Sequence, residues 1–181
     1  MLSKRQAGLI TALRSRHGRK DSDLCLCDGV RACSEGITLR PDLLEMIVLR
    51  EDFSADLAYP IEPVRLPVQE FDKLTQTVHS QGIITVSRKP DAVAADSPLA
   101  DPFALVLDQV RDPGNFGTII RTARAAGLKE IHLTKGSADP FQDKVIRSAS
   151  GAQFALAMRY YDDLAHLAAT LRKQGVTKYY R

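Results

Sequence analysis

The residues best suited to chemistry follow an apolar run in the second half of the chain. Residues 112–115 read Asp-Pro-Gly-Asn; Arg121 comes six residues after Asn115, with Arg124 one helical turn further. A glycine-containing turn that opens a helix offers free backbone N–H groups to an anion, and a nearby guanidinium could hold a phosphate. The segment matches neither the GxGxxG fingerprint nor a P-loop. A capped helix with solvated arginines is therefore the alternative interpretation.

The basic N-terminus is a second candidate for phosphate contact. The first 20 residues contain six Lys and Arg residues and no Asp or Glu. Clustering of this kind is typical of nucleic-acid-binding surfaces. A solvated helix face and an organelle transit peptide are the alternatives. The predicted phosphate contacts are Lys4, Arg5, Arg14, Arg16, Arg19 and Lys20.

Cysteine and histidine do not form a recognisable site. Cys25 and Cys27 are two residues apart in an apolar run, and neither they nor Cys33 belong to a CxxC pair or lie near a histidine. We therefore predict core packing for the cysteines, no disulfide framework and no metal. The four histidines have no nucleophile or carboxylate at motif spacing, so no catalytic triad is predicted.

The second half of the chain predicts a parallel sheet that would position residues 112–115. Strand-like and helical patterns alternate there as βαβαβαβ, which is typical of right-handed crossovers. Ligands of such sheets bind beyond the carboxyl ends of the strands. Pro113 and Gly114 fit the central positions of a type II turn. The predicted strands are 103–107, 130–134, 154–158 and 176–180, and the helices are 116–126, 140–147 and a segment from about 163 to 174.

The first 90 residues predict a smaller α/β domain. A helix from Lys4 to His17 has Ser3 as its candidate N-cap. Residues 91–101 are rich in Ala, Asp and Pro and lack strand alternation, so we predict a linker between domains 1–90 and 102–181. Further predicted strands are 24–27, 46–49 and 83–86, with helical segments from Val30 and around Asp56 and Phe71.

Composition sets the class of protein. The 181 residues include 25 Lys+Arg and 22 Asp+Glu, a net charge of +3, and 44% are hydrophobic, as in a folded globular protein. No apolar run approaches the roughly 20 residues that a membrane helix needs, so no membrane partner is expected. No signal peptide with an apolar core is evident, so a cytoplasmic location is expected.

At residues 112–123, DPGNFGTIIRTA, the sequence resembles the first signature motif of the SpoU (TrmH-like) RNA 2′-O-ribose methyltransferases of the SPOUT superfamily. Asp139-Pro140 and residues 144–152, KVIRSASGA, resemble the segment that follows in that family. The first domain is similar to the family's substrate-binding domain, with Asp28-Gly29 where Glu-Gly is more usual. The resemblance covers nearly the whole chain and is most specific in the two motif segments.

The resemblance implies methyl transfer from S-adenosylmethionine to a ribose 2′-hydroxyl of RNA, with ribosomal RNA as the expected substrate. It assigns Asn115 to the shape of the active site and makes Arg121 the catalytic arginine. Because a guanidinium stays charged in proteins, we expect Arg121 to clamp a phosphate and stabilise the developing alkoxide rather than to act as a base. Arg124, Arg147 and Ser148 are predicted RNA contacts. The family implies a homodimer, and the chemistry requires no metal.

The resemblance stops near the C-terminus. The family continues past the strand predicted at 176–180 through a Gly-Ser/Thr-Glu-type loop and an Ile-Pro segment followed by a Ser-Leu-Asn helix, which tie a trefoil knot and form most of the cofactor pocket. We find neither, so we expect a small α/β RNA-binding domain plus an incomplete parallel-sheet SPOUT domain, no assigned cofactor-binding residues, and a fragment of a longer enzyme. The alternative is a non-catalytic RNA-binding module that has lost the methyl-donor site.

Overall fold

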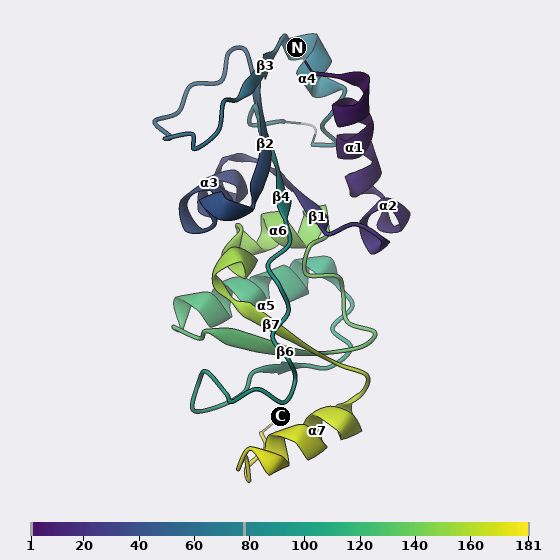
Figure 1. Ribbon diagram of the computed structural model, residues 1–181, viewed down its shortest axis with the longest axis vertical. Coiled ribbons are helices and arrows are strands. Elements are labelled where there is room, and N and C mark those ends of the chain that lie inside the picture. Colours follow the sequence, from purple (N-terminus) through teal and green to yellow (C-terminus); the bar gives the residue numbers. More distant parts are fainter. Residues whose placement is uncertain (1, 78, 181) are drawn as a thin grey trace.

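A computed structural model describes residues 2–77 and 79–180, and in them two sheets lie one beyond the other along the long axis of the molecule (Figure 1). The first sheet has the order β1-β4-β2-β3 and the second has the order β5-β6-β7. The strands are Leu24–Asp28 (β1), Leu44–Arg50 (β2), Val64–Leu66 (β3), Ile83–Arg88 (β4), Val106–Leu107 (β5), Glu130–Thr134 (β6) and Ala157–Tyr161 (β7).

Helices cover both faces of the first sheet because its strands alternate two apolar sets of side chains. Leu26 and its neighbours face the helices Lys4–Arg14 (α1) and Val68–Asp72 (α4). Cys25 and Cys27 point the other way, toward Val30–Leu39 (α3). The strands pair antiparallel except β2 and β3, which are parallel. A short helix, Arg16–Lys20 (α2), follows α1, and a 3₁₀ turn, Pro41–Leu43 (η1), precedes β2.

The second sheet is parallel throughout, as predicted. Helices Pro113–Ala125 (α5) and Asp143–Ala149 (α6) cover one face and bury Phe116 and Ile120 against it. Helix Leu164–Lys173 (α7) covers the other face. In Figure 1, α5 and α6 lie between the two sheets, so the helices that carry both motif segments sit where the two halves of the molecule meet.

One apolar cluster spans both halves of the molecule. Cys25, Cys33 and Ile37 of the first half pack in the same cluster as Ile146 and Phe154 of the second. Gly151 explains how closely they approach: its φ is 80°, and a Cβ there would lie 2.9 Å from the carbonyl oxygen of Ala32 in α3. The cysteines therefore have the packing role predicted for them. No group of His, Cys, Asp or Glu side chains in the described residues could hold a metal ion.

Residues 91–101 contain no helix or strand, but they are bound to the second half. The Val93 N–H donates to the carbonyl oxygen of Met158 in β7 at 3.0 Å. The Arg159 guanidinium donates to the carbonyl oxygens of Ala94, Ser97 and Pro98 at 2.9, 2.7 and 2.6 Å. The segment is thus held by main-chain and side-chain hydrogen bonds along much of its length.

None of the described helices is long and apolar enough to cross a membrane.

Several predicted elements differ from the structure. The helix predicted to run to His17 is interrupted at Ser15, whose extended backbone ends α1 and whose hydroxyl caps α2. No helix forms around Asp56. Asp112 is an N-cap and Pro113 begins α5, so the predicted type II turn is the first turn of that helix instead.

The ends of two predicted strands also shift. The strand predicted at 154–158 lies at Ala157–Tyr161, because Ala152–Ala155 (η2) forms a 3₁₀ turn after Gly151. The strand predicted at 103–107 is limited to Val106–Leu107. Residues 176–180 do not form a strand; they lie in an extended segment beside α7.

Candidate active site

The site begins where α5 starts, at the carboxyl end of β5. The Asp112 carboxylate accepts a hydrogen bond from the Asn115 N–H at 2.7 Å, which fixes the first helical turn. Pro113 occupies the first turn, where a missing N–H costs nothing. Asn115 is exposed in that turn, and its side chain has no hydrogen-bond partner among the described residues. Its amide is therefore free to donate to or accept from a ligand.

Glycine at position 117 allows α5 to touch α6. A Cβ there would lie 2.6 Å from the Ser148 Cβ and 2.7 Å from the Val145 carbonyl oxygen, closer than real atoms approach. The Ser148 hydroxyl donates to the Gly114 carbonyl oxygen at 2.8 Å. Ser148, a predicted RNA contact, is therefore used to join the two helices, although its oxygen can still accept a hydrogen bond.

Arg121 is exposed on the same helix, and its guanidinium has no hydrogen-bond or ion-pair partner within residues 2–77 and 79–180. Six residues of α-helix place Arg121 about 9 Å along the axis from Asn115 and roughly 120° around it. The two predicted catalytic side chains therefore do not meet. A ligand that contacts both must lie across the exposed surface of α5.

Two of the predicted phosphate contacts, Arg14 and Arg19, are buried in ion pairs. The Arg14 side chain is 5% exposed and forms ion pairs with Asp28 at 3.0 Å and Asp143 at 3.2 Å. Arg19 is 6% exposed and pairs with Asp139 at 3.3 Å. Each arginine joins the first half of the chain to a carboxylate of the second. If either side chain moved to an RNA phosphate, that carboxylate would lose this partner and the contact between the halves would weaken.

Arg124 and Arg147 are also engaged with the protein. Arg124 forms an ion pair with Glu35 of α3, again between the two halves. Arg147 pairs with Asp143 one turn earlier in α6 at 2.7 Å. Burial raises the pKa of the Asp143 carboxyl, while Arg147 and Arg14 act in the opposite direction. Contact with RNA at these two arginines would have to compete with existing pairs.

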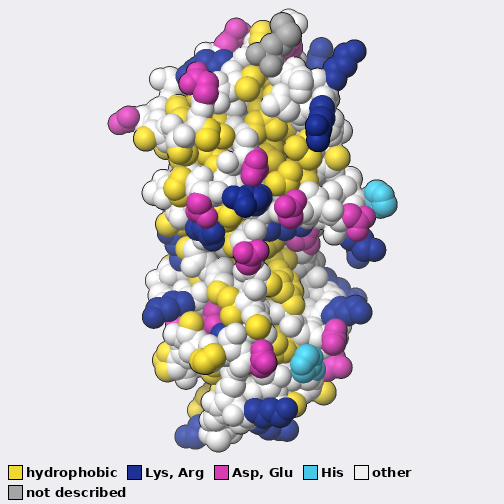
Figure 2. Space-filling model, viewed as in Figure 1, with side chains coloured by type: hydrophobic (Ala, Val, Ile, Leu, Met, Phe, Trp, Pro, Cys, Tyr) yellow, Lys and Arg dark blue, Asp and Glu magenta, His cyan; other side chains and the backbone are white. Residues whose placement is uncertain are grey.

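The remaining basic residues of the N-terminus are exposed. Figure 2 shows Lys and Arg side chains interspersed with Asp and Glu over the face in view, so that face carries no continuous basic patch. The predicted contacts whose side chains are exposed and have no partner among the described residues are Lys4, Arg5, Arg16 and Lys20.

The sequence did not reveal a buried charged network on β6 and β7. Arg159 pairs with Glu130 at 2.8 Å, with side chains 2% and 1% exposed. Glu130 also lies 3.4 Å from the His132 Nε2, and the His132 Nδ1 is 3.0 Å from the Tyr161 hydroxyl. Burial lowers the pKa of His132, which Glu130 partly opposes. Glu130 and Arg159 are far apart in the sequence, and no local spacing signals their pairing.

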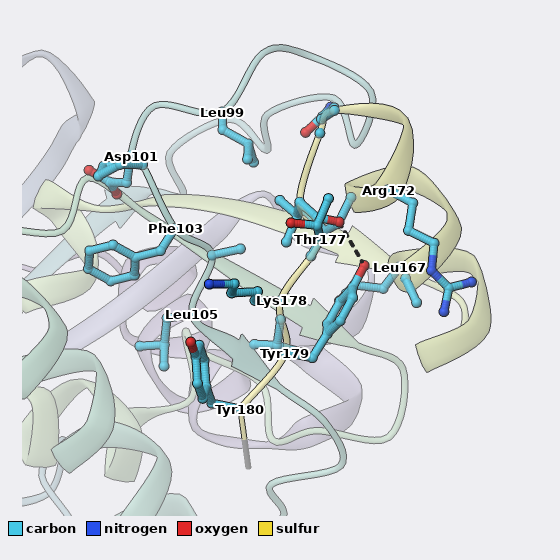
Figure 3. Close-up of a pocket in the computed structure, with 18 of the residues that line it drawn as sticks. Leu99, Asp101, Phe103, Leu105, Leu167, Arg172, Thr177, Lys178, Tyr179 and Tyr180 are labelled. Carbon is cyan, nitrogen blue, oxygen red and sulfur yellow. Dashed lines mark hydrogen bonds between the residues drawn. The ribbon is translucent and has the colours of Figure 1, made fainter.

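A hollow of about 1560 Å³ lies beside β5 and is a candidate space for a methyl donor (Figure 3). Its walls are mainly apolar and include Phe103, Leu105 and Leu167. S-adenosylmethionine carries adenine, amino and carboxylate groups, each of which needs oriented partners. Among the described residues, the lining offers one buried side-chain acceptor without a partner, the Oε1 of Gln174. The lining also contains exposed charged side chains, among them Asp108 and Lys178, and none of its residues is assigned to the donor.

Comparison with known proteins agrees with this geometry. Residues 102–181 match the model of the SpoU rRNA Methylase family. The 23S rRNA (guanosine(2553)-2′-O)-methyltransferase RlmP of Bacillus subtilis is 31% identical over 169 residues, which cover 92% of this chain and 66% of that protein. The human mitochondrial rRNA methyltransferase 3 is 28% identical over 84% of this chain, and the match spans 39% of its length.

Solved structures share the fold. A TrmH-family protein from Porphyromonas gingivalis has a TM-score of 0.81 and 28% identity, covering 97% of this chain and 69% of that one. An rRNA methyltransferase from Sinorhizobium meliloti, solved with AdoMet bound, has a TM-score of 0.78 and 22% identity, covering 96% and 67%. The α/β architecture is thus that of SPOUT methyltransferases, and through residues 102–181 the chain belongs to the SpoU rRNA methylase family.

Proposed function

We propose that the protein transfers a methyl group from S-adenosylmethionine to a ribose 2′-hydroxyl of ribosomal RNA. Family membership and the similarity to RlmP support this reaction. The observation that carries it is the state of the arginines in the two motif segments. Arg124 and Arg147 are paired with carboxylates, whereas Arg121 has no partner among the described residues. An exposed, uncommitted guanidinium in the family motif is what an anionic substrate needs.

The proposed roles follow from charge and position. Arg121 would hold an RNA phosphate or the 2′-oxygen as negative charge develops on it, because a fixed cation stabilises that charge without taking the proton. Asn115 would orient the ribose through its free amide. When bound, S-adenosylmethionine supplies a methyl group on a positively charged sulfur. Lys4, Arg5, Arg16 and Lys20 would contact phosphates of the RNA outside the reacting nucleotide.

A methyl-transfer assay tests the proposal. Tritiated S-adenosylmethionine and a 23S rRNA transcript are incubated with the protein and with Arg121→Gln, and Arg31→Gln is the control because it removes an exposed cation from α3. We expect Arg121→Gln to lower the rate by about 10²–10³-fold, as for the loss of one charge-stabilising group, and Arg31→Gln to leave it unchanged. Equal rates for Arg121→Gln and the unmodified protein would refute the role of Arg121. RNA binding without any methyl transfer would favour the non-catalytic RNA-binding module.

We further propose a homodimer that acts in the cytoplasm and needs no metal. Family resemblance supports the dimer and the independence from metal, since family members act as dimers through the catalytic domain and their chemistry requires no Lewis acid. Light scattering after gel filtration tests the dimer, and a mass of 19.9 kDa would contradict it. Cell fractionation tests the location, and full methyl transfer in the presence of EDTA tests the independence from metal.

A further inference from the structure

A cavity separate from Asn115 and Arg121 opens between the two halves of the molecule. It has a volume of about 760 Å³ and lies at the carboxyl ends of β6 and β7, facing α2. In Figure 1, α2 and the turn from β7 into α7 lie on the same side of the molecule. The volume falls within the roughly 300–1,000 Å³ typical of small-molecule sites. A single nucleotide is of suitable size.

Three exposed cations from separate segments line this cavity. Arg16 comes from α2, Arg111 from the segment before α5, and Lys135 from the turn after β6. The side chains of Arg16 and Lys135 have no partner among the described residues, and Arg111 donates to the neutral Gln109 amide oxygen at 3.0 Å. These cations are therefore available to bind an anion.

The two carboxylates in the lining only partly offset the charge of these cations. Asp139 is occupied by Arg19 and by the Phe141 N–H at 2.9 Å. Asp162 is exposed, and its carboxylate lies 3.9 Å from the His166 Nδ1. With four cationic and two carboxylate side chains in the lining, positive charge prevails.

Hydrogen bonds hold the cationic walls in place. The Arg19 guanidinium donates to the carbonyl oxygens of Leu13 and Arg14 as well as to Asp139, so α2 is fixed against the segment that follows β6. The Ala138 N–H donates to the Val110 carbonyl oxygen at 2.8 Å, which joins the segments that carry Lys135 and Arg111. The segments that carry the cations are thus held in place before any ligand arrives, which lowers part of the entropy cost of binding.

Tyr160 adds a flat aromatic surface to this wall. It is 47% exposed, unlike Tyr161, which is buried beside His132. Partial desolvation, with a smaller contribution from Asp139, raises the pKa of Tyr160 to about 12, so the ring is neutral at physiological pH. An exposed aromatic ring beside cations is the arrangement on which single-stranded nucleic acids stack their bases.

We propose that this cavity holds one unpaired nucleotide of the substrate RNA, with Tyr160 stacked on its base and Arg16, Arg111 and Lys135 on the flanking phosphates. The inference rests on the proposed function in one respect, that RNA is the partner. It adds a second point of contact, to which α2 of the first half and the turns of the second half both contribute. The cavity would therefore help to determine which nucleotide reaches Arg121.

RNA affinity measured against salt concentration tests this inference. The probe is a fluorescein-labelled single-stranded oligoribonucleotide, followed by anisotropy. Lys135→Gln should reduce the slope of log K against log salt by about 0.7, the value for one single-strand phosphate contact. The matched control is Lys129→Gln, an exposed lysine at the opposite end of β6. Tyr160→Leu should weaken binding about tenfold, whereas Tyr160→Phe keeps the stacking surface and should bind normally.

The outcomes separate this inference from the proposed reaction. Equal salt slopes for Lys135→Gln and Lys129→Gln, or equal affinity for Tyr160→Leu and the unmodified protein, would overturn the cavity as an RNA site even if methyl transfer is observed. Absence of RNA binding by the unmodified protein would overturn it as well. Loss of binding in the cavity variants alone would support it, even if no methyl transfer is detected. Circular dichroism on each variant confirms that these exposed substitutions leave the fold intact.

Discussion

Replacing Arg159 by Met should destabilise the protein and release the segment between its two halves. Arg159 is buried in β7, where it pairs with Glu130 and donates to four carbonyl oxygens of residues 94–98. Methionine fills a similar volume but provides no donor. The substitution would leave the Glu130 carboxylate buried without its cation, next to the uncharged His132.

The magnitude follows from that orphaned charge. Removing one partner of a buried ion pair costs about 3–5 kcal/mol, and the carbonyl oxygens add little because they are only partly buried and water can replace the guanidinium there. We expect a loss of about 4 kcal/mol, a large part of the 5–15 kcal/mol typical of a folded domain. For a chain of this length, such a loss lowers Tm by roughly 10 °C.

Urea unfolding followed by circular dichroism measures this loss. The control is Arg88→Met, because Arg88 pairs with Glu45 at the surface, where both side chains are 49% exposed, and its removal should cost less than about 1 kcal/mol. Adding Glu130→Gln to Arg159→Met should recover part of the loss by removing the orphaned charge. Limited proteolysis should cut Arg159→Met within residues 91–101 faster than the unmodified protein. Equal stability losses for Arg159→Met and Arg88→Met would refute this reasoning.

Two further predictions concern packing and pH. Gly117→Ala should lower the free energy of unfolding by about 2 kcal/mol, because the new Cβ would overlap Ser148. The control, Gly8→Ala on the open surface of α1, should raise it by up to about 1 kcal/mol. Equal effects of the two substitutions in urea unfolding would contradict the contact between α5 and α6. Because burial lowers the pKa of His132, the unfolded chain takes up its proton first as pH falls below about 6.5. Stability should therefore fall on acidification from neutral pH, and less steeply in His132→Gln.

The regular elements were predictable because their signals are local. Residues 130–134 form a strand with the predicted bounds, and the helix predicted at 116–126 forms, although it begins three residues earlier. The prediction failed where a tertiary contact decides the backbone. Ala152–Ala155 is a 3₁₀ turn and not part of a strand, because Gly151 must pass close to α3 of the other half. Nothing in the sequence near residue 154 records that approach.

The candidate site was predictable only in its motif. The motif placed Asn115 and Arg121 on the exposed surface of one helix, but it does not reveal the pairing of Arg124 with Glu35, which is 89 residues away in the chain. The cavity beside α2 is a similar case. Arg16, Arg111 and Lys135 come from three segments that the fold brings together, and each of them alone resembles an ordinary solvated cation.

The arginines show why charge clustering in a sequence cannot by itself define a binding surface. Arg14 and Arg16 are two residues apart in the same basic segment, yet Arg14 is buried between two carboxylates and Arg16 is exposed at a cavity. A buried guanidinium cannot leave its partners for a phosphate without a cost of several kcal/mol, whereas an exposed one meets the phosphate at little cost. Arg14, Arg19 and Arg124 therefore link the two halves, and the arginines that we propose as RNA contacts have no such ion pair among the described residues.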